Sequence, residues 1–163
     1  MTDAQIYAGA AAMGAVAGLR SMSAPAMVSQ VAKAGRIAMG HSELDFLHSP
    51  KTAYAMTALA VGEVIADKLP FMPKRTKGPS VLGRAVTGGL SGAAISSSRR
   101  RSPFWGAIAG AAGAIGATYA FFYLRCAAKQ KLHVPDPVAA VIEDAVVAAS
   151  GMLVLSKVQA LRA

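Results

Sequence analysis

The sequence contains few charged and few aromatic residues for its size. Of 163 residues, 15% are charged and 6% are aromatic, whereas a soluble domain carries about 25% charged residues. Apolar residues make up 54% of the chain, with Ala and Gly abundant, and the mean hydropathy is positive. Small residues suit helices that pack closely in lipid, where bulky apolar side chains gain nothing over lipid tails. The composition therefore predicts an integral membrane protein.

Cysteine and amino-terminal positive charge are also scarce. The chain has one cysteine, Cys126, which excludes an intrachain disulfide. The apolar run from Ala4 to Leu19 is similar to a secretory signal, but it is preceded by Asp3 and by no Lys or Arg. A signal peptide needs a positively charged start. We therefore expect this run to belong to the folded protein.

The net charge of +9 would indicate nucleic-acid binding in a soluble protein. Here the basic residues cluster in short connectors beside apolar runs, such as residues 74–77 and 99–101. This distribution is typical of residues that anchor membrane spans to lipid headgroups. We therefore predict the lipid bilayer as a partner and no nucleic acid.

Long apolar runs predict five membrane segments in one all-α domain covering residues 1–163. The clearest runs from Ser102 to Leu124 without a charge, which is long enough to cross a hydrocarbon core of about 30 Å. Each of the others carries a charge, and these segments cover residues 4–32, 52–66, 81–98 and 138–156. The first is either one long tilted helix or a helix broken between Gly18 and Pro25. All are expected to be helical, because an open sheet edge cannot face lipid.

The predicted location is the bacterial inner membrane, with several passes. With five spans, the Lys and Arg residues divide equally between the two sides. The positive-inside rule therefore leaves the orientation open.

Several ionisable residues interrupt the predicted spans. At the bilayer centre such a side chain costs about 2.5 kcal/mol or more, so it needs a partner or a function. The predicted central polar cluster, a candidate ion or substrate site, comprises Arg20, Ser23, Glu63, Asp67, Arg84, Thr87, Glu143 and Asp144.

The economical arrangement of this cluster pairs Arg20 with Glu143 and Arg84 with Glu63. Bidentate bonds between guanidinium and carboxylate would offset part of the desolvation. Such pairs could only lock the helices in register, or they could line a hydrated site for an ion, proton or small anion. The sequence leaves both alternatives open.

Two parts of the chain resemble one another. The pattern of an Arg followed three residues later by a hydroxyl occurs at Arg20 and at Arg84, and each is followed later by a Glu-bearing segment. This predicts repeat units 4–70 and 80–158, an arrangement found in small transporters whose sites lie at the repeat interface. The extra span from Ser102 to Leu124 is not explained by a simple duplication.

Glycines recur at a spacing that allows helix backbones to approach closely. The pairs are Gly14 and Gly18, Gly88 and Gly92, and Gly106 and Gly110. We expect internal helix packing, with a homodimer as the alternative.

A connector holds four side chains with metal-ligating atoms: His41, Glu43, Asp45 and His48. They are suitable donors for a divalent metal, but no zinc-type pair of histidines on one helix turn occurs. A polar loop at the headgroup surface is the favoured interpretation. We predict no cofactor, and nothing in the sequence supports an enzyme.

Four blocks of sequence together resemble a known family. They are Gly18–Ser21, Gly62–Pro70, Gly83–Gly92 and Ile142–Ala145. In this order they are similar to the domain-of-unknown-function 4126 family of small membrane proteins, from about residue 15 to residue 155. The resemblance implies a multi-span, mostly bacterial membrane protein, and it carries over no catalytic residue.

The function predicted from these features is a transporter or channel-like protein for an ion or small solute. One alternative is a non-transporting scaffold or assembly protein with structural ion pairs. A second is a membrane-bound lipid-handling protein or enzyme. A hydrated cavity reaching Glu63 and Glu143 would favour transport, whereas a dry, paired centre would favour a scaffold. A cleft lined by His41, Asp45 and His48 would favour lipid or metal chemistry.

Overall fold

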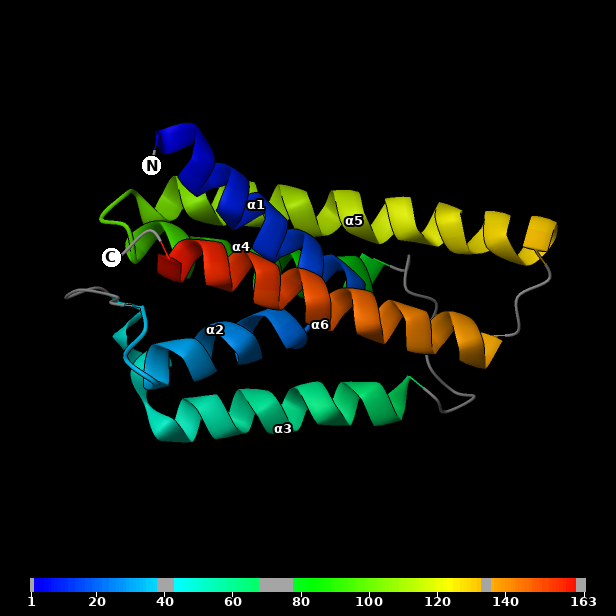
Figure 1. The fold of residues 1–163 in the computed structure, drawn as a ribbon, viewed down its shortest axis with the longest axis horizontal. Helices are drawn as coiled ribbons and strands as arrows, with labels where there is room; N and C mark the ends of the chain where they lie inside the picture. Colours follow the sequence, from blue (N-terminus) through cyan, green and yellow to red (C-terminus); the bar gives the residue numbers. More distant parts are fainter. Residues whose placement is uncertain (1, 38–42, 68–77, 133–135, 161–163) are drawn as a thin grey trace.

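The computed structural model describes residues 2–37, 43–67, 78–132 and 136–160, and within them the protein is all-α. These residues form six α-helices and one short 3-10 helix (Figure 1). The elements are α1 (Asp3–Leu19), α2 (Ser23–Lys33), η1 (Asp45–His48), α3 (Pro50–Ala66), α4 (Gly78–Ser97), α5 (Pro103–Leu132) and α6 (Asp136–Ala160).

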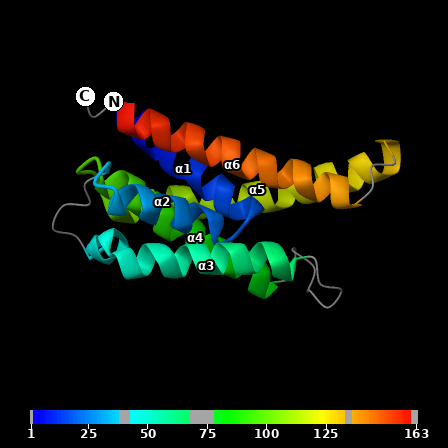
Figure 2. The ribbon, with the colours of Figure 1, turned by 60° about the horizontal axis from the view of Figure 1, so that its bottom comes forward.

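The first predicted segment is broken, and the chain reverses at the break. Helix α1 ends at Leu19, Arg20 has extended backbone with φ −137° and ψ 114°, and α2 begins at Ser23. Figures 1 and 2 show α1 running away from the end that holds both termini and α2 returning towards it. Pro25 lies in the first turn of α2, where a missing N–H removes no helical hydrogen bond. The broken alternative is thus confirmed, and a single crossing by residues 4–32 is wrong.

The six helices alternate in direction along the bundle (Figures 1 and 2). The reversal after α1 therefore adds an element to the five expected and brings the amino terminus to the end where the chain finishes. The extra reversal places the amino terminus at the opposite end from the one expected with five segments. No Lys or Arg precedes Arg20, so the division of basic residues between the two ends stays as expected.

Helices α1, α4 and α5 make the most extensive contacts in the bundle. The glycines at the predicted close-packing spacing form this seam. A methyl group on Gly14 would overlap the Gly110 carbonyl, one on Gly92 would overlap the Gly106 carbonyl, and one on Gly18 would overlap the Ala114 carbonyl. One on Gly88 would stand 2.6 Å from the Ala114 Cβ. The three backbones approach so closely only because these positions carry no side chain.

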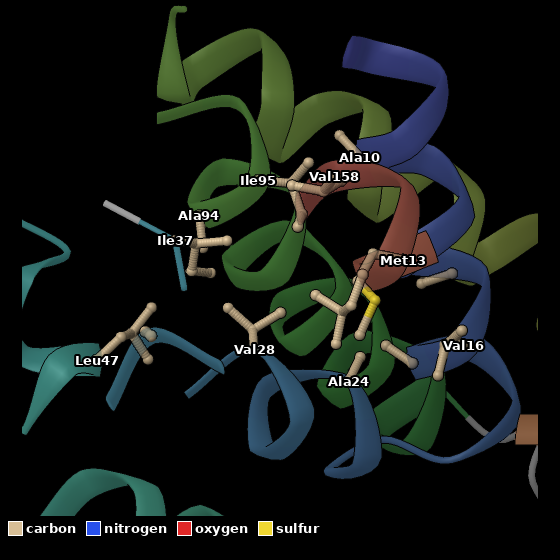
Figure 3. Packing of buried hydrophobic residues seen from close by; sticks show 14 of the residues in the cluster. Ala10, Met13, Val16, Ala24, Val28, Ile37, Leu47, Ala94, Ile95 and Val158 are labelled. Atoms are coloured by element: carbon tan, nitrogen blue, oxygen red, sulfur yellow. The ribbon is translucent and has the colours of Figure 1, made fainter. Parts of the chain in front are cut away.

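Helix α2 packs against α3. The Gln30 amide donates to the Thr57 hydroxyl at 2.8 Å, and the Lys33 ammonium lies 4.0 Å from the centre of the Tyr54 ring. On its other side α2 contributes Val28 to a core shared with α1, α4 and α6 (Figure 3).

The outer surface is apolar to an unusual degree. Large apolar side chains are exposed on four helices, including Ile65 of α3, Leu82 of α4, Trp105 of α5 and Leu153 of α6, at 61%, 66%, 59% and 57% exposure. Among the described residues, one helical stretch has the length and hydropathy of a membrane span, Pro103–Ala127 in α5. The core helix of a soluble protein can meet the same criterion, but only 17% of the apolar window in this stretch is buried.

Because the glycine seam has no space for side chains, Gly110→Ala should destabilise the fold. The added methyl group would overlap the Gly88 carbonyl, and overpacking of this kind costs about 1–3 kcal/mol. The matched control is Gly116→Ala in the same helix, where nothing lies within 4 Å, and where Ala should stabilise by about 0.5–1 kcal/mol. Unfolding of the purified protein followed by circular dichroism measures both. Equal stability of the two variants would contradict the close backbone packing at Gly110.

Candidate functional site

The reversal between α1 and α2 is held by two charged side chains from other helices. A helix end leaves backbone groups without helical partners. The carboxylate of Glu63, from α3, accepts hydrogen bonds from the N–H groups of Ser21 and Met22, both at 2.8 Å. At the other side of the break, Arg84 of α4 donates from Nη1 to the Gly18 carbonyl at 2.9 Å.

These charges match the polarity of the two helix ends. A helix carries partial positive charge at its amino end and partial negative charge at its carboxyl end. The Arg84 guanidinium lies at the carboxyl end of α1, and the Glu63 carboxylate lies at the amino end of α2. The Thr118 hydroxyl of α5 donates to the same Gly18 carbonyl at 3.0 Å. Five helices, α1 to α5, thus meet at one break in the chain.

Arg20 lies in the break itself and binds two carboxylates. Its Nη1 is 3.1 Å from Asp67 Oδ2, after the end of α3, and its Nε donates to Asp144 Oδ1 of α6. The Arg20 side chain is 3% exposed, whereas those of Asp67 and Asp144 are 20% and 34% exposed. The guanidinium is therefore buried beneath two carboxylates that reach the surface.

Both predicted ion pairs are wrong. Arg20 binds Asp144 rather than its neighbour Glu143, and Glu143 instead accepts from Arg125 of α5 at 3.4 Å. Consecutive residues of an α-helix point about 100° apart, so only one member of this acidic pair can face Arg20.

The second predicted pair, Arg84 with Glu63, fails for a different reason. Both side chains are bonded to backbone at the reversal. The sequence shows where charges are, but it does not show which backbone groups a broken helix will leave without partners.

The two hydroxyl residues of the predicted cluster differ in position. The Thr87 hydroxyl lies 3.3 Å from that of Ser21 and also donates to the Gly83 carbonyl of its own helix at 3.1 Å. Ser23 begins α2, and its backbone N–H donates to the Arg20 carbonyl at 3.3 Å. The structure therefore brings seven predicted residues to the reversal and its immediate neighbours: Arg20, Ser23, Glu63, Asp67, Arg84, Thr87 and Asp144.

Sequence reasoning missed three contributors to this cluster. They are the backbone of residues 18–22, the hydroxyl of Thr118 and the guanidinium of Arg125. The Ala-Thr-Tyr context of Thr118 carries no signal. Arg125 directly follows the clearest predicted span, which ends at Leu124, but α5 continues to Leu132 and carries it.

An open cavity of about 810 Å³ lies against α3 and α4 and reaches the reversal. Its polar lining comes from Ser21, Glu63 and Thr87, and much of the remainder is apolar, as at Leu59 and Leu82. A mostly apolar pocket with a few convergent polar groups is typical of a ligand site.

The two Arg-bearing segments of the predicted repeat differ in local structure. Arg20 is extended at the reversal, whereas Arg84 lies inside the uninterrupted helix α4. Each helix of the first half runs in the opposite direction to its counterpart in the second half: α1 to α4, α2 to α5 and α3 to α6 (Figure 1). The repeat itself stays a prediction.

Three of the four metal candidates, Glu43, Asp45 and His48, lie in the described part of the chain. The His48 ring nitrogen Nδ1 lies 3.4 Å from Asp45, its Nε2 lies 3.1 Å from the Ile37 carbonyl, and Glu43 is exposed. His41 lies outside the described residues. Within the part of the chain that the structure describes, no three His, Cys, Asp or Glu side chains are placed to hold a metal ion.

The model of a protein family described as a domain of unknown function, DUF4126, matches residues 7–157 of the chain. The match covers most of the sequence, so the chain belongs to this family. No curated protein and no solved structure shows a significant match to it.

The two carboxylates on Arg20 should act as a unit when they are removed. Asp67→Asn or Asp144→Asn alone leaves the guanidinium one carboxylate, and each should cost about 1 kcal/mol of stability. The double variant leaves a buried unpaired charge, which costs about 3–5 kcal/mol, more than the sum of the singles. A double-mutant cycle from denaturant unfolding measures the coupling. Asp3→Asn, which removes the exposed pair with Arg101 at 2.7 Å, is the control and should cost less than about 1 kcal/mol. Additive effects at Arg20 would contradict the shared role.

Proposed function

We propose that this member of the DUF4126 family is a multi-pass integral membrane protein that moves an ion or small solute through a polar site at the α1–α2 reversal. The observation that carries the proposal is the open cavity of about 810 Å³, which reaches a carboxylate, Glu63, at a break in the helical backbone. Discontinuous helices of this kind supply the substrate sites of many secondary transporters.

The distribution of side chains supports a membrane location. Arg20, Arg84 and Glu143 are buried at 2%, 5% and 7% exposure, while large apolar side chains cover the outside of α3, α5 and α6. Soluble proteins rarely expose extended apolar surface. Apolar outside and charged inside is the arrangement that lipid favours.

The depth of the reversal follows from its contact with α5. Thr118 bonds the Gly18 carbonyl, and the candidate span in α5 begins at Pro103. At 1.5 Å per residue, Thr118 lies about 22 Å along that helix, inside a hydrocarbon core of about 30 Å. Helices α1 and α2 would then enter and leave on the same side as a re-entrant hairpin. Non-helical backbone at this depth is tolerated where protein buries it or where it lines a hydrated cavity.

Glu63 couples binding to the shape of the site. Its carboxylate makes two charge-assisted hydrogen bonds to the start of α2, and such bonds are about twice as strong as neutral ones. A proton or a cation at Glu63 would neutralise that charge and weaken both bonds. Occupancy of the cavity would therefore loosen the reversal, which gives the protein two states that a transported ion can select.

A second candidate function is a non-transporting scaffold. The observation that favours it is the neutralisation of Arg20 by two carboxylates and of Glu143 by Arg125. In that case the cluster only fixes the helices relative to one another. The two candidates differ in whether water reaches the cavity in the membrane and in whether charge moves.

Cysteine labelling can measure whether water reaches the cavity. The method suits this protein because its one cysteine, Cys126, is easily replaced. In a Cys126→Ser background, Thr87→Cys should react with a membrane-impermeant maleimide in proteoliposomes, since Thr87 lines the open cavity. Ser91→Cys, one turn further along α4 and 0% exposed, should stay unlabelled until the protein is denatured. Protection of both positions would favour the scaffold.

Charge movement tests transport directly. Proteoliposomes on a solid-supported membrane should give transient currents on a jump in pH, Na⁺ or K⁺ concentration. Glu63→Gln should reduce the responding current about tenfold or more, because the amide cannot take up the ion. Glu43→Gln, an exposed position outside the cluster, is the control and should leave it unchanged. Absence of any wild-type current, with Glu63→Gln lowering only stability, would leave the scaffold as the function.

A further inference from the structure

A second cavity, of about 590 Å³, lies between α1 and α6 near the end that holds the termini. The described residues that line it all belong to these two helices. The lining residues are Gln5, Ala8, Gly9 and Ala12 of α1 and Val154, Lys157, Val158 and Ala160 of α6. The α1 residues follow the spacing of one helix face, so the cavity is a groove along that face. We call it the α1–α6 groove.

Further from the termini, α6 packs closely against its neighbours. Gly151 of α6 meets Met27 of α2 and Val16 of α1, and a methyl group on it would overlap the Met27 sulfur. Near the termini the groove is lined on the α1 side by Gln5 and by three small residues, Ala8, Gly9 and Ala12. A methyl group on Gly9 would find its nearest neighbour, Ile95 Cγ2, at 3.9 Å. The small residues therefore leave space in place of helix contact.

The floor of the groove is apolar and its rim carries one positive charge. Val158 is 3% exposed and packs into the core beside Ile95 (Figure 3). Lys157 is exposed and has no acidic partner among the described residues, whereas Arg101 at the same end is paired with Asp3 at 2.7 Å. The Lys157 ammonium is thus available to an anion from outside the chain.

The level of Lys157 is that of lipid headgroups if the protein lies in a membrane. The start of α5 and the end of α6 lie at the same end of the bundle (Figure 1). The start of α5 carries exposed Phe104 and Trp105, and exposed aromatic side chains gather at the membrane interface.

We propose that the α1–α6 groove binds an anionic phospholipid, with an acyl chain along Ala8, Gly9 and Ala12 and the phosphate on Lys157. The assignment rests on the membrane location in the proposed function, but it does not depend on transport. Charge complementarity selects this occupant, since a Lys between helices at headgroup level attracts anionic lipid and the lining, which is apolar except for Gln5 and Lys157, accepts an acyl chain. A second copy of the protein is the competing occupant.

Lipid binding can be measured by native mass spectrometry of the detergent-purified protein with phosphatidylglycerol or phosphatidylcholine. The wild type should retain phosphatidylglycerol in preference. Lys157→Gln should weaken this binding about fivefold, the effect of one Lys at a lipid surface, and Lys157→Arg should preserve it. The matched control is Lys51→Gln, an exposed Lys outside the groove, which should bind as the wild type does.

Filling the groove tests the acyl-chain part separately. Ala8→Phe should reduce the retention of both lipids, while Ala4→Phe, an exposed position on the same helix that does not line the groove, should have no effect. Equal retention of the two lipids by wild type and Lys157→Gln would overturn the inference, as would a dimer that Ala8→Phe dissociates. Recovery of the protein in the soluble fraction of cells would instead overturn the proposed membrane function.

Discussion

The structure depends on satisfying the backbone at the reversal between α1 and α2. A buried N–H or C=O without a partner costs about 1–3 kcal/mol, and the break exposes several such groups in the middle of the bundle. Glu63 supplies the acceptor for two N–H groups, and Arg84 and Thr118 supply donors for the Gly18 carbonyl. These bonds tie α3, α4 and α5 to one point of the chain. The charges that first suggest an ion pathway are therefore also the caps of two helices.

The glycine seam is what lets those caps reach their partners. Thr118 of α5 can bond the Gly18 carbonyl because Gly18 has no side chain to hold α1 away from Ala114. In the same seam Gly88 brings α4 against α5 four residues after Arg84, which places that guanidinium over the end of α1. Close backbone packing and backbone capping are thus one arrangement, and a larger residue in the seam would withdraw the donors as well as crowd the helices.

Part of this arrangement is visible in the sequence. Hydropathy identifies α5, the apolar composition predicts helices, and the charges inside apolar runs predict the residues that gather at the reversal. The pairing of those charges is not visible, because Glu143 and Asp144 are adjacent in sequence but face different helices. The number of helices was also misjudged, since hydropathy stays high through residues 4–32 while the backbone direction changes at Arg20. Hydropathy measures what a segment is made of, and direction depends on where hydrogen-bond partners from distant helices become available.

The pattern of partners distinguishes Glu63 from the other acidic residues of the cluster. Asp67, Asp144 and Glu143 each face a guanidinium, so replacing any of them by its amide removes a counter-charge from an arginine that is buried or half-buried. Among the described residues Glu63 bonds only backbone N–H groups, and neutralising it strands no full charge. An isolated buried cation is far more expensive than a weakened amide hydrogen bond. Glu63 is therefore the carboxylate in this cluster that is bonded to backbone and not to an arginine, and it is also the one that lines the open cavity.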